Sequence, residues 1–259
     1  MITRKIIAIG GYGTHDGTSK IFEDTLKIDQ EIIRLTGKSR PKILFIPTAS
    51  HDSSKYCEMF ENFYGAKMKC HVDMLKLYKE KLSFDQIKNK IMNADIIYVG
   101  GGNTLRMMRF WRKLGIDELL KKAWQKGKVL CGVSAGSICW FQYGVSDSRQ
   151  FKNPKSKVYI RVRGLGLIKN LICPHVNSKM HDKSFRSKGL KNISQKKSGV
   201  AIALEDQCAI EIINDNYRII SANNSAKAFK VFWKNGKYYQ QEIPVNQKAH
   251  SLRKLFHKP

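Results

Sequence analysis

The sequence lacks the features that mark secreted, disulfide-stabilised and membrane proteins. Its six cysteines are scattered through 259 residues and form no Cys-x-x-Cys pair, which argues against a disulfide scaffold and against a zinc site. No apolar run approaches the roughly 18 residues of a membrane span, and the apolar stretch that ends at Gly10-Gly11 is shorter than a signal-peptide core. We therefore expect a protein of the reducing cytoplasm that is neither secreted nor inserted in a membrane. Most of the cysteines lie in apolar, strand-like contexts and are predicted to be buried.

Acidic residues are also scarce, with 21 against 47 basic residues, and the net charge is +26. Half of this excess falls between Arg149 and Lys197, where 14 basic residues accompany one acidic residue. Such a field could attract nucleic acid, anionic lipid or acidic peptides. The plainer interpretation is that lysine simply occupies the solvated faces. The charge therefore raises the question of a partner without answering it.

The first 135 residues alternate short apolar runs with amphipathic stretches, and 42% of the chain is hydrophobic. Short apolar runs predict strands at Lys5–Gly10, Lys42–Ile46, Met68–Leu75, Asp95–Val99 and Val129–Val133, and four of the five are rich in Ile, Val or Leu. Helical spacing predicts helices at Ser19–Leu35, Ser54–Tyr64, Ser83–Met92 and Thr104–Trp124. This alternation is typical of an α/β fold, with a parallel sheet covered by helices on both sides.

After Gly144 the pattern changes to closely spaced β-like runs, with one helix predicted at Lys183–Ile193. The later strands are expected at Leu171–Cys173, Val200–Leu204, Cys208–Ile213, Tyr217–Ile220 and Ala228–Trp233. Nothing resembles a linker or a repeat. We expect a single domain over residues 1–259, with a core at about 1–233, an antiparallel C-terminal portion and a basic C-terminal extension.

The sharpest motif is Gly132-Val133-Ser134-Ala135-Gly136, which follows an apolar strand and precedes a short helix predicted to run to Phe141. This is the context of a nucleophile elbow, in which a tight turn lifts the serine side chain above the sheet. The N–H of Ala135, at the helix start, is then placed to stabilise an oxyanion. Ser134 is therefore the predicted nucleophile.

A second glycine-rich turn, Gly100-Gly101-Gly102-Asn103, also ends a strand and opens a helix. Glycines allow a ligand to approach the backbone closely, and Asn103 is a candidate helix cap and substrate-binding residue. The spacings of phosphate loops and dinucleotide-binding loops are absent. Amides of this turn could complete an oxyanion hole beside Ser134.

A serine nucleophile needs a base, and His175 has the best context because it follows a short apolar run. His181 is the reserve candidate, and His15 in the first strand–helix loop is a possible substrate contact. The base needs a carboxylate to orient it. Asp147 and Glu205 compete for that role, and the position of Glu205 at a strand end favours it.

Taken together, Gly100-Gly-Gly-Asn103, Gly132-Val-Ser-Ala-Gly-Ser137, Trp140-Phe141 and Cys173-Pro-His175 resemble the peptidase E (aspartyl dipeptidase) family of serine peptidases, to which cyanophycinase is related. The resemblance runs from the first strand to about residue 233. It implies a three-layer parallel-sheet sandwich like that of class I glutamine amidotransferases, and a Ser-His-Glu triad of Ser134, His175 and Glu205. It also implies oxyanion amides from Gly101 and Ala135.

The resemblance implies a peptidase that needs no metal or organic cofactor and acts on short peptides, with an acidic residue such as an N-terminal aspartate. A cation would then be expected in the specificity pocket, and Arg186 is the candidate, with Arg161 and Arg163 as alternatives. The competing hypothesis is a non-catalytic scaffold that binds nucleic acid or acidic ligands through its basic segment. A thiol enzyme using Cys131 or Cys139 is set aside because neither cysteine holds the elbow position. Either a monomer or a homodimer is compatible with the sequence.

Overall fold

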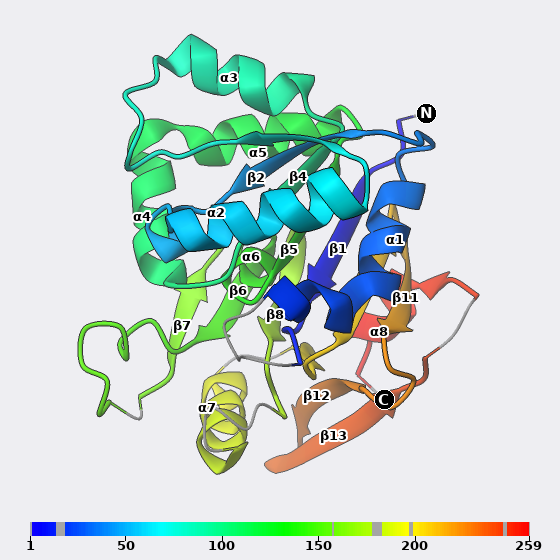
Figure 1. The fold of residues 1–259 in the computed structure, drawn as a ribbon. Coiled ribbons are helices and arrows are strands. Elements are labelled where there is room, and N and C mark those ends of the chain that lie inside the picture. The colour runs from blue at the N-terminus through cyan, green and yellow to red at the C-terminus, as the bar shows by residue number, and fades with distance from the viewer. Residues whose placement is uncertain are drawn as a thin grey trace.

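In the computed structural model of the chain, five neighbouring parallel strands form one side of the first sheet, out to its edge (Figure 1). The structure describes residues 2–13, 19–156, 158–177, 183–196, 199–245 and 248–258, and His15 and His181 lie outside them. This sheet has eight strands in the order β14-β11-β10-β1-β5-β4-β2-β3. Their bounds are β1 Lys5–Ile9, β2 Lys42–Ile46, β3 His71–Met74, β4 Ile96–Val99, β5 Val129–Val133, β10 Cys208–Ile213, β11 Asn216–Ser221 and β14 His250–Ser251. The predicted parallel α/β core is confirmed.

Both faces of this sheet are buried, because successive residues of each central strand point into different apolar clusters. In β1, for example, Ile6 and Ala8 belong to one cluster, whereas Ile7 and Ile9 belong to the other. Helices that cover the first face are α3 Phe84–Asn93, α4 Thr104–Leu114, α5 Ile116–Gln125 and α6 Ala135–Ile138. The opposite face is covered by η1 Ser19–Thr25, α1 Leu26–Arg34, α2 Ser54–Phe60 and η3 Glu61–Lys67. The short turn η2 at Thr48–Ser50 lies on the first face, where Ala49 packs.

The long helix expected at Thr104–Trp124 is two helices. Gly115 separates α4 from α5 in the left-handed conformation, with φ 70°. Glycine adopts this conformation without steric cost, so it ends α4 and begins α5 at once. Asn103 caps the start of α4 by accepting a hydrogen bond from the N–H of Arg106.

The second half of the chain builds a separate sheet of six strands, in the order β13-β12-β9-β8-β6-β7. Its strands are β6 Phe141–Ser146, β7 Ile160–Arg163, β8 Ile168–Cys173, β9 Ala201–Leu204, β12 Ala228–Lys234 and β13 Lys237–Ile243. One face shares its apolar cluster with the first sheet, and the other is covered by α7 Lys183–Gln195 (Figure 1). The helix predicted to run through Phe141 instead ends at Ile138, and Phe141 starts β6.

The chain beyond residue 233 packs against this frame. It supplies β13 and β14 and the short helix α8 at Leu252–Phe256, of which Leu255 is 4% exposed. The Lys258 ammonium donates to the carbonyl of Trp233 at 3.0 Å. Within the described part of the chain, no helix combines the length and the apolar character that crossing a bilayer requires.

Candidate active site

Ser134 sits on a sharp turn between β5 and α6, with φ 56° and ψ −109°. This left-handed conformation is unusual for a residue with a Cβ and is the strain expected of a nucleophile elbow. Glycines on either side make the turn possible. A Cβ on Gly136 would lie 1.9 Å from the Val99 carbonyl oxygen, and one on Gly132 would lie 2.6 Å from it. The two glycines therefore let α6 pack directly on the end of β4.

The Ala135 N–H is in the first position of α6, where an amide has no acceptor within the helix. The second glycine turn lies beside it, because a Cβ on Gly101 would be 3.5 Å from the Ser134 Cβ. The Gly101 N–H donates to the Tyr56 hydroxyl at 3.5 Å, the long end of the hydrogen-bond range. The two amides named from the sequence thus lie next to the serine.

Asn103 is held by the protein itself. Its Oδ1 accepts from the Arg106 N–H at 3.0 Å, and its Nδ2 donates to the Ser148 carbonyl at 3.3 Å. These bonds fix the start of α4 to the loop that follows β6.

His175 follows β8, and its Nδ1 is 2.6 Å from the Oδ1 of Asp206, which follows β9. The two side chains are 12% and 10% exposed. Because β8 and β9 run parallel, their carboxyl ends meet at one edge of the second sheet. The Asn177 amide oxygen accepts from the Asp206 N–H at 2.8 Å and fixes this turn. The pair has the geometry of a histidine oriented by a carboxylate.

Glu205 is the expected partner of His175, but in the structure the neighbouring Asp206 makes that contact. Successive residues of an extended strand point to opposite sides. The Glu205 carboxylate accepts from the Lys227 N–H at 2.8 Å, and the Glu205 N–H donates to the Lys227 carbonyl at 3.0 Å. Glu205 thus fastens the end of β9 to the start of β12, while Asp206 turns toward the histidine.

Asp147, the alternative carboxylate, forms an ion pair with Arg186 at 2.9 Å. Arg186 is 2% exposed, and its other terminal nitrogen donates to the Pro174 carbonyl at 3.2 Å. The arginine named as a specificity residue therefore ties α7 to the residue before His175. Arg161 lies over the ring of Tyr143 at 4.6 Å.

The segment that follows β1 joins the serine to the histidine–aspartate pair. The Ser134 N–H donates to the Ile9 carbonyl at 3.1 Å. Two residues further on, a Cβ on Gly11 would lie 2.0 Å from Asp206 Oδ1 and 2.3 Å from His175 Nδ1. Gly11 is therefore needed for the close approach of the pair to β1. In the sequence, this close approach is indicated by the pair Gly10-Gly11 at the end of a strand, because a simple turn does not require the second glycine.

A buried polar cluster lies behind the Gly101 amide. The hydroxyl of Tyr12 is 3.0 Å from that of Tyr56 and 3.1 Å from that of Tyr98. Burial raises the pKa of Tyr56 to about 12, so the hydroxyl stays protonated. These tyrosines were not singled out from the sequence because they come from three separate segments.

Thiol chemistry has little support in the structure. All six cysteines are buried and unbridged, and burial raises the pKa of Cys131 and Cys139 well above the usual value. Among the described residues, no three His, Cys, Asp or Glu side chains gather as metal ligands.

Comparisons with known proteins show the family to which the chain belongs. An uncharacterised peptidase of Bacillus subtilis, YgaJ, is 33% identical over 243 residues, which cover 93% of this chain and 98% of the relative. The uncharacterised peptidase Lmo0363 of Listeria monocytogenes is 32% identical over 123 residues, covering 45% of this chain and 56% of the relative.

Two solved structures share the fold. A crystal structure of a peptidase from an acI-B1 Actinobacterium superposes with a TM-score of 0.70 at 17% identity, covering 96% of this chain and 97% of the other. A putative peptidase E protein from Listeria monocytogenes gives 0.62 at 20% identity, covering 85% and 98%. The model of peptidase family S51 matches residues 13–220. The expected kinship is confirmed: this chain is a member of peptidase family S51 and a peptidase hydrolase.

Proposed function

We propose that this chain is a serine peptidase of the cytoplasm that hydrolyses short peptides through an acyl-enzyme on Ser134. The observation that carries the proposal is the 2.6 Å hydrogen bond between His175 and Asp206. Residues 9–11 contact both this pair and the strained turn at Ser134. Asp206 takes the orienting role that the resemblance gave to Glu205.

In this mechanism Asp206 bonds to Nδ1, and the Nε2 of His175 accepts the Ser134 proton as Oγ attacks the scissile carbonyl carbon. The oxyanion is stabilised by the N–H groups of Gly101 and Ala135. His175 then gives the proton to the departing amine, the carbon–nitrogen bond breaks, and an ester remains on Ser134. Water attacks the ester, His175 takes its proton and returns one to Oγ, and the carboxylate product leaves.

The proposed substrates carry an acidic residue near the scissile bond, with an N-terminal aspartate as the first candidate. The support for this is the excess of 47 basic over 21 acidic residues and the family resemblance. Arg186 already pairs with Asp147, so it contributes to specificity through the position of the His175 loop rather than as an uncommitted cation.

The test compares wild type, Ser134→Ala and Cys139→Ser on a panel of chromogenic aminoacyl amides led by Asp and Glu. Loss of a triad nucleophile removes a factor of roughly 10⁶ in kcat. We expect Ser134→Ala to be inactive and Cys139→Ser to retain activity within about twofold. Turnover by Ser134→Ala, or loss of turnover in Cys139→Ser, would refute the assignment. If the wild type hydrolyses amides of residues other than Asp and Glu, the peptidase assignment is supported and the proposed preference for acidic residues is refuted.

A further inference from the structure

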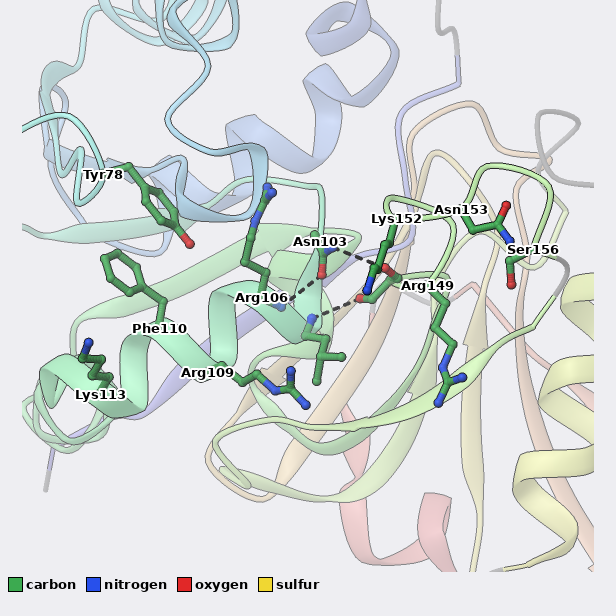
Figure 2. A pocket seen from close by; sticks show the side chains of 12 residues that line it. Tyr78, Asn103, Arg106, Arg109, Phe110, Lys113, Arg149, Lys152, Asn153 and Ser156 are labelled. Carbon is green, nitrogen blue, oxygen red and sulfur yellow. Dashed lines mark hydrogen bonds between the residues drawn. The ribbon is translucent and has the colours of Figure 1, made fainter.

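A hollow lies along the exposed side of α4, and we call it the α4 pocket (Figure 2). Its volume is about 800 Å³, within the range of small-molecule and peptide sites. Its walls come from α4, from the loop after β6 and from Tyr78. Lining residues are Tyr78, Asn103, Leu105, Arg106, Arg109, Phe110, Lys113, Ser148, Arg149, Lys152, Asn153 and Ser156.

The charge of this pocket is one-sided. Five of its lining side chains are cationic and none is acidic, with Arg106, Arg109 and Lys113 on α4 and Arg149 and Lys152 on the facing loop. Three other cavities of this chain each contain at least one carboxylate among their cations. Among these four cavities, the lack of acidic side chains is therefore specific to the α4 pocket, and the high lysine content of the chain does not account for it.

These cations have few internal partners. None of the five forms an ion pair with a carboxylate among the described residues. Arg106 donates to the Ala49 carbonyl at 3.2 Å, and its buried Nε has no hydrogen-bond partner in the part of the chain that the structure describes. Guanidinium groups left unpaired in a hollow are suited to bind carboxylates from outside.

The pocket is held in shape by the fold. At its inner end, the Ser148 hydroxyl accepts from the Leu105 N–H at 3.0 Å, which joins the two walls. At its outer end, the ring of Tyr78 is stacked between His51 at 4.1 Å and Phe110 at 4.4 Å. A site with fixed walls loses less free energy on ordering when it binds.

One wall of the pocket begins close in sequence to a proposed oxyanion amide. Asn103 lines it and is two residues from Gly101, whose amide is proposed to bind the oxyanion. The ten steps from Asn103 to Lys113 span about 15 Å along the helix, at 1.5 Å per residue. An extended peptide advances about 3.3 Å per residue, so four or five residues would fill this length.

We propose that the α4 pocket binds an acidic stretch of a peptide substrate, four to five residues long, that continues from the scissile bond. This inference rests on the proposed function for its substrate but stands on separate residues. Nucleic acid is the less favoured ligand, because single-stranded bases need open aromatic faces to stack on. The faces of Tyr78 are already covered by His51 and Phe110.

The binding test uses the full chain with Ser134→Ala, so that no peptide is consumed. Two fluorescein-labelled hexapeptides of equal length serve as probes, one with four glutamates and one with four glutamines. The test variant adds Arg109→Ala, Lys113→Ala and Arg149→Ala. The matched control adds Lys88→Ala, Lys122→Ala and Lys126→Ala, which removes the same charge from another cavity that contains an acidic residue.

We expect the glutamate peptide to bind at least tenfold more tightly than the glutamine peptide by fluorescence anisotropy. Each lost ion pair at an exposed site weakens binding about two- to threefold, so the test variant should bind about tenfold more weakly. The control should change the Kd by less than twofold. Equal weakening in both triple variants, or no preference for glutamate, would overturn the proposal. An oligothymidylate that binds more tightly than the glutamate peptide, and loses affinity in the test variant, would assign the pocket to nucleic acid instead.

A hydrolysis assay distinguishes failure of this inference from failure of the proposed function. For this assay Ser134 is restored in both triple variants. The same kcat/KM on the glutamate peptide in wild type and in both triple variants would support the peptidase and refute the pocket. If the glutamate peptide binds through the pocket but the chain hydrolyses no substrate of the panel, the pocket proposal is supported and the proposed peptidase function is refuted. Circular dichroism of all variants checks that the fold is intact, and Arg109→Lys with Arg149→Lys should restore most of the affinity.

Discussion

Exchange of Asp206 for asparagine tests the proposed catalytic geometry most directly. The carboxylate accepts from a ring nitrogen at 2.6 Å, and both side chains are nearly excluded from water. An asparagine fits the same space but can present its amide N–H₂ to Nδ1, which favours the wrong tautomer of His175. The structure should survive, because the bond from the Asp206 N–H to Asn177 involves the backbone.

The expected loss is large. Removal of the orienting carboxylate in triads of this geometry lowers kcat by roughly 10²–10⁴. At about 1.4 kcal/mol for each factor of ten, this equals about 3–5 kcal/mol of transition-state stabilisation. Glu205→Gln is the matched control, because its carboxylate accepts only a backbone N–H from Lys227 among the bonds described. A glutamine oxygen accepts the same bond, so kcat should fall by less than about threefold.

The assay is steady-state hydrolysis of the best amide of the panel, with melting temperature as the measure of fold. The reasoning is refuted if Glu205→Gln loses activity by 100-fold or more while Asp206→Asn remains within threefold of wild type. That outcome would restore Glu205 as the third member of the triad. Equal, small effects of both variants would reject a carboxylate-oriented histidine altogether.

Two further predictions follow from buried positions. Gly11→Ala would place a methyl group 2.0 Å from Asp206 Oδ1, so activity should fall at least 100-fold with the fold retained. At Gly199 no atom lies within 4 Å of the position of a new Cβ, so Gly199→Ala should keep the activity within twofold of wild type. Comparable losses of activity in the two variants would contradict this explanation. Burial raises the pKa of Asp29 to about 7, against hydrogen bonds from Tyr64 and Thr25 that lower it. The folded state therefore holds a proton between about pH 4 and pH 7 that the unfolded state releases, so the free energy of unfolding should fall by about 4 kcal/mol across this range and stay flat above it. Asp29→Asn should abolish this slope in urea unfolding at several pH values, and an unchanged slope would show that another group causes it.

The proposed nucleophile and base could be named from the sequence because each depends on a local pattern. Ser134 lies between two glycines that only a tight strand-to-helix turn requires, and His175 follows a short apolar run that forms β8. The choice between Glu205 and its neighbour was not local. It depends on hydrogen bonds to Lys227, which is 22 residues further along the chain.

The division into two sheets was not predictable for a similar reason. Strand order is set by hydrogen bonds between segments that are distant in sequence, and the β-like runs after Gly144 fit either sheet equally well. The polar edge strand β13, at Lys237–Ile243, carries little of the apolar alternation that predicts a strand, and most of it is exposed. At the start of β6, the aromatic pair Trp140-Phe141 continues the apolar pattern of the preceding helix, so the sequence predicts that the helix runs on.

The two sheets explain why glycines follow β1 at the point where the candidate site forms. Ser134 belongs to the first sheet, whereas His175 and Asp206 belong to the second. A Cβ on Gly10 would lie 2.1 Å from the Glu205 carbonyl oxygen, and one on Gly11 would collide with the Asp206 carboxylate. The sheets can approach this closely only where β1 ends in residues without side chains. Because a serine must lie within hydrogen-bond reach of its base, packing between the sheets would set the geometry of the proposed triad. A substitution that separates the sheets slightly would thus reduce activity before it unfolds either one.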